Sequence, residues 1–249
     1  MKSYTVITLF PELVETYKKV GIVGRAGKNR LFEVSAVNPR DYAEKPRHVD
    51  DTPYGGGPGM VIMVEPVKRA IDDIKGSLEG SSHVINLTPQ GKVFRQNDVF
   101  ELMQFDNLIL IAGRYEGIDD RINYYVDDEY SVGDFVLSGG EIPAILMIDA
   151  IVRNIPGVLG DSSSLETESH SGGLLDFPHY TKPSIFEGAS VPQVLLSGNH
   201  SSIEKWRQKQ RLGRTSLKRP DLMNFVVLNE TDQALLSEFL LEQDQSYEE

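Results

Sequence analysis

Strand-length apolar runs alternate with segments of helical period along the first 160 residues, and this alternation restricts the fold more than any other feature. The apolar runs are Tyr4–Leu9, Phe32–Asn38, His83–Leu87 and Asn107–Ala112. The helical segments are Pro11–Val20, Val64–Lys75 and Ile142–Arg153. Short apolar strands separated by helices are typical of a parallel sheet that is covered on both faces. Residues 1–160 therefore predict an α/β domain with a mostly parallel sheet.

Two glycines are expected to end the first two helices. Pro11 suits the first position of a helix, where its missing N–H is not needed. Gly21 and Gly76 each follow the last residue of a helical segment, where a left-handed residue closes the C-terminus. We therefore expect the first helix to end at Val20 and the second at Lys75.

The composition changes after Pro156-Gly157. Residues 161–180 hold four acids and no Lys or Arg, and five serines and two glycines lie between Ser162 and Gly173. Such a composition is typical of an exposed linker or lid. Further on, apolar pairs recur at helical spacing at Leu235/Leu236 and Phe239/Leu240. The predicted organisation is a domain over 1–160, a flexible linker over 161–174 and a small, mainly helical domain over 175–249.

The charge is acidic overall and basic in one place. The chain has 25 Lys and Arg against 37 Asp and Glu, a formal charge of −12, which argues against a non-specific nucleic-acid coat protein. Residues 201–220, however, hold seven Lys or Arg and one acid, a local charge of +6. Arg207, Arg211 and Arg214 share one helical face there. This face is either a solvated surface or a surface that contacts phosphate, and the near absence of acids favours phosphate.

Several classes of site are disfavoured by what the sequence lacks. There is no cysteine, and the five histidines lie far apart, so we expect neither a disulfide nor a metal centre. The longest apolar run, near Leu108–Ala112, is too short to cross a bilayer. Glu12 interrupts the N-terminal segment before a signal-like stretch develops. We expect a cytoplasmic protein that does not contact membranes.

Three glycine-rich segments are candidates for ligand binding. They are Asp50–Met60, Gly113–Arg121 and Ser131–Pro143. Glycine lets the backbone approach a ligand closely, and the second segment directly follows a predicted buried strand, where ligands of open α/β sheets bind. The third could read an adenine edge with its main chain beside an apolar slot. Each has a structural alternative: a surface hairpin, a strand-to-helix turn with a surface ion pair, and a tight packing turn.

Together these segments resemble the bacterial tRNA (guanine-N1)-methyltransferase family TrmD, of the SPOUT superfamily. The resemblance covers about Lys2 to Leu222, in order and with nearly the family spacing. The matching motifs are Ile7–Glu12, Asp50–Met60, Leu87–Gly91, Gly113–Asp119, Gly133–Glu141, Gly173–Asp176, Pro178–Thr181, Leu195–His200 and Trp206-Arg207.

The resemblance implies a knotted fold, a donor and an acceptor. It implies a trefoil-knotted N-terminal domain, a homodimer with an active site shared between subunits, S-adenosylmethionine as methyl donor and guanosine 37 of tRNA as acceptor. The donor-binding residues that it implies are Leu87, Thr88, Pro89, Gly113, Glu116, Val132, Gly133, Asp134, Phe135, Val136, Leu137, Gly139, Gly140 and Pro143. Tyr115 would hold the target base, Asp50 and Gly59 would contact its neighbour, and Arg207, Arg211 and Arg214 would grip the tRNA.

The resemblance also implies the catalytic pair. Guanine N1 becomes nucleophilic only as a base removes its proton, and the charge that spreads toward O6 favours a nearby guanidinium. The cation corresponds to Arg153, and an ungapped count from Gly173 places the base at Glu168, where the family has Asp. Glu166 and His170 remain alternative bases. Magnesium assists the family, with no assignable site here. Because a fold does not determine its target, a different methylated position or a different RNA is a further reading. The change from Asp to Glu leaves one more, a tRNA-binding protein with weak catalysis.

Overall fold

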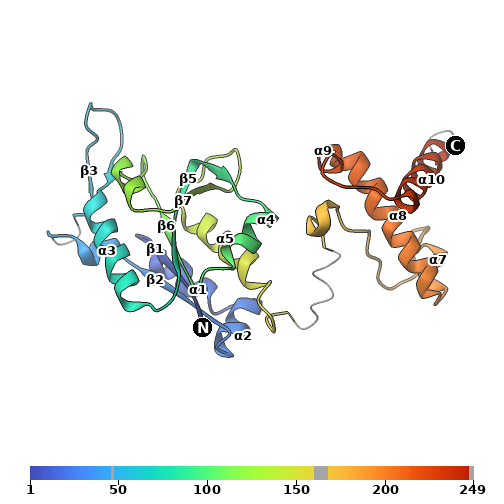
Figure 1. Cartoon of the computed structure of the whole chain (residues 1–249), viewed down its shortest axis with the longest axis horizontal. Helices are drawn as coiled ribbons and strands as arrows, with labels where there is room; N and C mark the ends of the chain where they lie inside the picture. Colours follow the sequence, from blue (N-terminus) through green and yellow to red (C-terminus); the bar gives the residue numbers. More distant parts are fainter. Residues whose placement is uncertain (46–47, 160–167, 247–249) are drawn as a thin grey trace. The chain divides into compact units, whose positions relative to one another are not determined.

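The computed structural model describes residues 1–45, 48–159 and 168–246. The chain forms two compact units, Met1–Gly160 and Asp161–Glu249 (Figure 1). The two units are described separately below.

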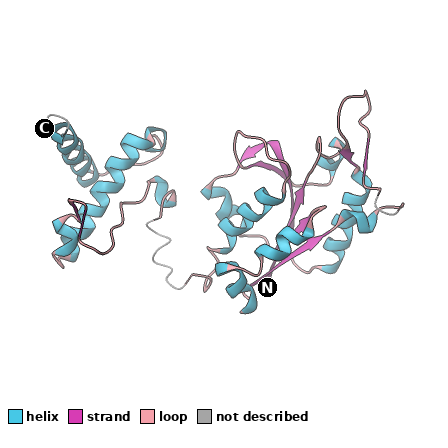
Figure 2. Cartoon of the chain, turned by 180° about the vertical axis from the view of Figure 1, so that it is seen from behind, coloured by secondary structure: helices cyan, strands magenta, loops and turns pink. Residues whose placement is uncertain are grey.

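The first unit is built on a parallel sheet of five strands (Figure 2). Its order is β2 (Phe32–Val37), β1 (Lys2–Ile7), β6 (Asn107–Ala112), β5 (Ser82–Val93) and β7 (Asp128–Ser131). Every neighbouring pair is parallel. The prediction of an α/β fold with a parallel sheet is therefore confirmed, and the central strand β6 matches its predicted range and is buried at every residue.

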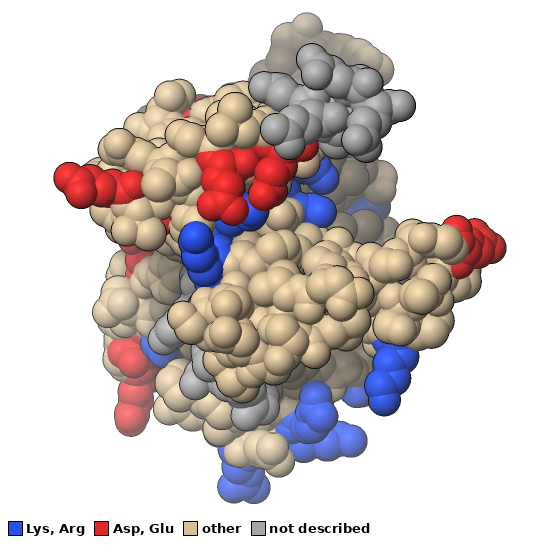
Figure 3. Space-filling model, turned by 90° about the vertical axis from the view of Figure 1, so that its right-hand side faces the viewer, with Lys and Arg blue, Asp and Glu red and all other residues tan. Residues whose placement is uncertain are grey.

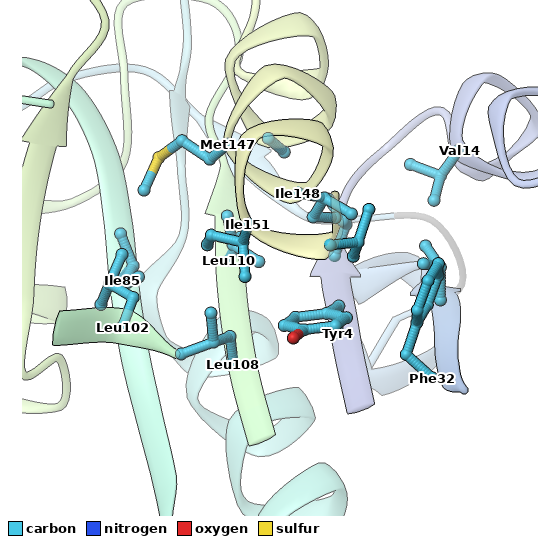
Figure 4. Close-up of a cluster of buried hydrophobic side chains, with 14 of the residues drawn as sticks. Tyr4, Val14, Phe32, Ile85, Leu102, Leu108, Leu110, Met147, Ile148 and Ile151 are labelled. Atoms are coloured by element: carbon cyan, nitrogen blue, oxygen red, sulfur yellow. The ribbon is translucent and has the colours of Figure 1, made fainter. Parts of the chain in front are cut away.

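Helices cover both faces of the sheet. They are α1 (Pro11–Tyr17), α2 (Gly21–Lys28), α3 (Val64–Ser77), α4 (Gln96–Leu102) and α5 (Glu141–Val152), with 3-10 turns η1 (Pro39–Tyr42) and η2 (Asp120–Tyr124). Because side chains alternate along a strand, Leu108 and Leu110 pack under α5 (Figure 4), whereas Ile109 and Ile111 pack against α3. The sheet thus separates two apolar cores.

Two predicted helix ends are wrong. The first helix ends at Tyr17, three residues early, and Gly21 (φ +59°) begins α2 instead of closing α1. The turn between them is tight because Gly24 packs on the Lys19 carbonyl, where a Cβ would come within 2.4 Å. Helix α3 continues through Gly76 to Ser77, and the chain adopts a left-handed residue only at Gly80 (φ +89°). Isolated glycine is tolerated inside a helix, so residue type alone misplaced this end.

The second unit is mainly helical in its described part, as predicted. It contains η3 (Ser171–Gly173), a hairpin of β8 (Ile185–Phe186) and β9 (Ala189–Ser190), and helices α7 (Gln193–Leu196), α8 (His200–Lys218), α9 (Pro220–Met223) and α10 (Glu230–Ser246). Helices α8 and α10 pack closely at Gly213, where a Cβ would come within 2.1 Å of the Phe239 ring. Leu212 and Leu235 form their shared core with Leu174.

Part of the predicted linker lies outside the described residues. Of the range 161–174, only residues 168–174 are described, and they form a turn followed by η3. Across the described ranges, no helix combines the length and the apolar character needed to span a membrane.

Candidate functional site

A cavity of about 390 Å³ opens where β6 and β7 end and where β5 leaves its regular pairing. Most of the residues expected to bind the methyl donor line this cavity. They are Leu87, Thr88, Pro89, Gly113, Glu116, Val132, Gly133, Phe135, Val136, Leu137, Gly139, Gly140 and Pro143. Asp134 is exposed on the same loop and does not line it. The structure therefore gathers nearly the whole expected set, and its role in binding stays a prediction.

One wall of the cavity is a break in the pairing between β5 and β7. Leu87 and Lys92 both face Tyr130, so residues 88–91 bulge out of the ladder. Their main-chain groups are thereby left for other partners, and Thr88 and Pro89 line the cavity. The bulge requires Gly91, because a Cβ there would come within 2.5 Å of the β7 backbone.

The opposite wall is apolar and exposed. Phe135, Val136 and Leu137 are 56%, 88% and 40% exposed, although all three line the cavity. The loop that carries them turns at Gly133 (φ +143°) and is held locally by hydrogen bonds with the Ser131 hydroxyl. Exposed apolar side chains in a concave surface are typical of a ligand site. The sequence predicts an apolar slot formed by Val132, Val136 and Leu137. All three line the cavity, and the slot itself stays a prediction.

The second and third glycine-rich segments meet at the cavity through their main chains, and the first segment docks on the second. The amide of Gly140 donates to the Gly113 carbonyl at 2.9 Å, and Arg114 pairs with Gly139 as an isolated bridge. The first segment forms a hairpin of β3 (Asp50–Asp51) and β4 (Val61–Ile62), as its structural alternative proposed. This hairpin also docks on the second segment, because the Glu116 amide donates to the Met60 carbonyl at 3.0 Å.

The residues expected near the target base lie along this junction. Gly59 lies against Glu116, since a Cβ on Gly59 would come within 2.5 Å of the Glu116 carboxylate. Tyr115 is half exposed, lines the cavity and has a left-handed backbone (φ +61°), which is uncommon for a bulky residue and frequent at functional sites. Asp50 lies on β3 opposite Ile62, outside the cavity lining.

An ion pair stabilises the second segment as it leaves the cavity. The Asp119 carboxylate accepts from the Arg121 side chain at 2.5 and 2.8 Å and from its amide at 3.0 Å. The hydrogen bond from the guanidinium lowers the pKa of Asp119 below its usual value. The surface ion pair proposed as the structural alternative is therefore present, and it fixes the turn beside the cavity.

The sequence analysis missed one buried ion pair at the site. Glu141, at the first position of α5, is only 1% exposed and lies 2.9 Å from Nε of Arg114. Both residues are in the motifs quoted above, but the sequence did not indicate that they would pair with each other. A carboxylate at the start of an otherwise apolar helix is the one sequence signal that could have drawn attention to it.

The residues expected to form the catalytic pair belong to different units. Arg153 caps the C-terminus of α5 and is half-buried. Glu168 is half-buried in the second unit, and Glu166 lies outside the described residues. His170 is exposed, with a left-handed backbone (φ +72°), and its amide donates to the Leu174 carbonyl at 2.8 Å.

The basic residues of α8 differ in their partners. Arg207 pairs with Glu204 at 2.6 Å and stacks over Phe177, and Arg211 contacts the Gln208 amide oxygen at 3.5 Å. Arg214 has no ionic partner among the described residues. On the face drawn in Figure 3, some Lys and Arg side chains likewise lie beside acids and others lie apart from them.

The described residues contain no group of three His, Cys, Asp or Glu side chains placed to hold a metal ion. Magnesium therefore has no assigned ligands in the described part of the chain.

Comparison with known proteins identifies the family. The sequence pattern described as tRNA (Guanine-1)-methyltransferase TrmD matches residues 1–225. A tRNA (guanine-N(1)-)-methyltransferase of Photobacterium profundum is 52% identical over 239 residues, which cover 95% of this chain and 96% of the relative. The enzyme of the same name from Legionella pneumophila (strain Paris) is 52% identical over 244 residues, 97% of each chain. The chain belongs to the tRNA (guanine-N1)-methyltransferase family TrmD.

Proposed function

We propose that this chain methylates N1 of guanosine 37 in tRNA, with S-adenosylmethionine as donor. The observation that carries the proposal is the meeting of two distant glycine-rich segments, Gly113–Arg121 and Ser131–Pro143, at one cavity, with the segment Asp50–Met60 docked on Glu116, in a chain that belongs to this methyltransferase family. The fold alone does not indicate a substrate, because one fold serves many reactions. The site residues and the family membership together support tRNA as the substrate.

The cavity fits the donor in size and chemistry. Its volume of about 390 Å³ is within the range of cofactor pockets. The bulge at residues 88–91 offers main-chain donors and acceptors for a purine edge, and Val136 and Leu137 offer an apolar surface for its ring. Bound there, the donor supplies an electrophilic methyl group on a sulfonium. Glu116, which lines the cavity beside Gly59, would lie near the end that carries this group.

The chain's own residues would activate the guanine. Glu168 would accept the N1 proton as the ring nitrogen attacks, and the longer side chain keeps the carboxylate chemistry of the family's Asp. Arg153 would stabilise the negative charge that develops on O6. The target base would leave the anticodon-loop stack to reach the site, with Tyr115 as a stacking partner.

Helix geometry supports an active site shared between two subunits. Gly140 and Pro143 at the start of α5 line the cavity, whereas Arg153 caps its other end. The helix has 12 residues, so its ends lie about 18 Å apart at about 1.5 Å per residue. Arg153 is therefore far from the cavity of its own chain. In a dimer with antiparallel α5 helices, the partner's end of the helix would reach the cavity instead.

The exposed side of α5 supports the same arrangement. Ile142, Leu146, Asp149 and Arg153 follow helical spacing along it, and Ile142 and Leu146 are 61% and 44% exposed. Helix α5 is otherwise apolar and buried, and an exposed apolar stripe on such a helix is typical of a subunit interface. We therefore include a homodimer in the proposal.

The helical unit would bind the body of the tRNA through α8. Its acidic neighbour α10 engages Lys209 through Glu238 and Glu242 at 2.8 and 2.7 Å. Arg214 and Lys218 have no such acid among the described residues, so they keep their charge for phosphate. The overall acidity would then limit adhesion to RNA in general, and the reaction would take place in the cytoplasm on tRNA.

The knotted topology is part of the proposal. The chain returns from the edge strand β7 across the carboxyl end of β6, where Gly140 packs on Ala112 and a Cβ would come within 2.7 Å of its Cα. Such a backbone crossing is what a threaded segment requires. Magnesium assistance also remains a proposal from the family, to be tested by chelation.

The test is a methylation assay with purified protein. Labelled S-adenosylmethionine is incubated with tRNA transcripts that carry G37 or A37, and the product nucleoside is identified by mass spectrometry. We expect 1-methylguanosine only in the G37 transcript. Methylation of another position would contradict the proposed target. Binding of tRNA without methyl transfer would favour the non-catalytic reading that the Glu at position 168 suggests.

A further inference from the structure

A buried carboxylate connects three elements behind the apolar wall of the cavity. Glu141 accepts from the hydroxyl of Thr8, just after β1, at 2.7 Å. It also accepts from Nε of Arg114, just after β6, at 2.9 and 3.2 Å. Glu141 and Thr8 are each only 1% exposed. The Glu141 carboxylate therefore lies in a medium where charge interactions are strong and where its charge would be costly without a partner.

Arg114 links Glu141 to the loop that forms the apolar wall of the cavity. Its Nη1 donates to the Ser138 carbonyl at 3.1 Å, and its guanidinium lies 4.4 Å from the centre of the Phe10 ring. Gly139 makes room for it, because a Cβ there would come within 2.2 Å of the Arg114 Nε. The side chain thus lies directly across residues 138 and 139, where the wall ends.

The wall has few other attachments. The polar contacts at its start, between Ser131, Gly133 and Phe135, are local to the loop. At its end, the loop is joined to the strand by the Arg114 side chain, by the amide of Gly140 and by the main-chain bridge between Arg114 and Gly139. Because residues 134–138 are exposed, packing contributes little to their position. The Arg114 guanidinium is the side chain from outside the loop that holds the end of the wall at Ser138.

We propose that Glu141 is a positioning residue for the methyl-donor site, which holds Arg114 across Ser138 and Gly139 and so sets the apolar wall against the ligand. The inference rests on the proposed donor site. A planar guanidinium can pair with the carboxylate and donate to a carbonyl at the same time, with fixed geometry between the two. An ammonium at position 114 could satisfy only one of these demands well.

The experiment measures ligand binding and loop order in four full-length proteins. These are the wild type, Glu141→Gln, Arg114→Lys and the double variant Arg114→Gln/Glu141→Gln. S-adenosylhomocysteine affinity is measured by calorimetry, thermal midpoint by calorimetric melting, and loop order by hydrogen exchange of amides 132–139. Glu65→Gln is the matched control, because Glu65 pairs with Arg69 at 2.5 Å on the exposed face of α3, outside the cavity.

We expect Glu141→Gln and Arg114→Lys to weaken ligand binding by about tenfold or more. In these variants, the ligand should no longer protect amides 132–139 from hydrogen exchange. The double variant leaves no buried unpaired charge, so its thermal midpoint should recover toward the wild type. Its affinity should stay low, because the Ser138 carbonyl still lacks its contact with the guanidinium. The control should bind as the wild type does.

Two results would overturn the inference. The first is wild-type affinity and wild-type loop protection in a folded Arg114→Lys protein. The second is recovery of both stability and affinity in the double variant, because Glu141 and Arg114 would then have only a structural role. If Glu141→Gln does not fold, these two variants still decide the matter. A wild type that fails to bind S-adenosylhomocysteine would instead contradict the proposed function itself.

Discussion

The hydroxyl of Tyr17 donates a hydrogen bond of 2.6 Å to Oδ1 of Asp149, which joins α1 to the exposed side of α5. Burial of the phenol and this bond raise the pKa of Tyr17 above its usual value, so the tyrosine stays a donor at all ordinary pH. Asp149 lies one turn before Arg153. Helices α1 and α5 therefore present one continuous face, to which Leu13 and Leu146 contribute exposed apolar side chains.

Replacement of Leu146 by Asp should dissociate the dimer that this face is proposed to form. Leu146 is 44% exposed in the single chain, so the charge is tolerated there, but it would be buried unpaired in an interface. We expect a monomer by light scattering and a loss of methylation of at least about 100-fold, because about 3 kcal/mol or more is lost. Val227→Asp, at a 96% exposed site of the second unit, is the control. An intact dimer in Leu146→Asp would place the interface elsewhere.

Mixed dimers should reveal whether Arg153 acts on the partner's cavity. Arg153→Ala removes the cation, and Leu137→Glu places a charge in the cavity wall. Each variant alone should be inactive. After the two are mixed and subunits exchange, one site in each mixed dimer would combine an intact cavity with an intact Arg153. Activity should reappear, up to half of the wild-type rate per mixed dimer, in a tritium-release or filter assay. No recovery despite exchange would assign Arg153 to its own chain.

The base assignment can be tested with three variants at two positions. Glu168→Gln should reduce turnover by about 10²–10⁴-fold, because the proton acceptor is lost, with unchanged S-adenosylhomocysteine affinity. Glu168→Asp restores the family residue and should keep substantial turnover. His170→Gln should be nearly normal. Single-turnover rates give the comparison, and a normal rate in Glu168→Gln would move the role to His170 or Glu166.

The tRNA affinity should respond most to Arg214 and Lys218, the basic residues of α8 that have no acidic partner among the described residues. Arg214→Gln/Lys218→Gln should weaken binding and lower the slope of log affinity against log salt by about two, one for each lost phosphate contact. The triple change at Arg207, Arg211 and Arg214 should do the same to a greater extent. Lys205→Gln is the control, because its ammonium lies 3.9 Å from the Glu238 carboxylate. Unchanged affinity in both variants would make α8 a solvated face.

The contact between α8 and α10 should depend on pH at the acid end. Burial alone would lower the pKa of Lys209, but its hydrogen bonds to Glu238 and Glu242 outweigh this effect and raise the pKa above its usual value. The bond from Lys209 lowers the pKa of Glu238 below its ordinary 4.5. The stabilisation is therefore complete above pH 4.5 and is lost as the pH falls through the lowered value.

Lys209→Met provides the measurement. The variant should be less stable by about 1–2 kcal/mol at pH 7, since a charged hydrogen bond is lost while the two exposed acids remain solvated. Its difference from the wild type, followed by circular dichroism during heating, should shrink between pH 5 and pH 3. A difference that stays constant over this range would show that Lys209 acts through packing of its aliphatic stem.

The sequence was sufficient for features whose cause is local. The five apolar residues of β6, Leu108–Ala112, predicted a buried strand, because a short continuous apolar run is typical of a strand covered on both faces. The helical spacing of Val64, Val67, Ile71 and Ile74 predicted one apolar face of α3; the last three are buried there, and Val64 is partly buried against the same core. The glycine-rich segments and their order also carried the family resemblance, and nearly all of the expected donor-site residues line one cavity.

Features whose cause lies in a distant segment were decided by the tertiary structure alone. β7 is a strand because it pairs with β5, although its sequence, Asp128–Ser131, has no apolar pattern. Glu141 is buried because Arg114 and Thr8, from two other elements, supply its hydrogen bonds. A carboxylate in isolation prefers water by many kcal/mol, so no sequence rule places it in a core. What the chain determines by itself is where apolar surface must go, and what only the fold decides is which polar groups can follow it.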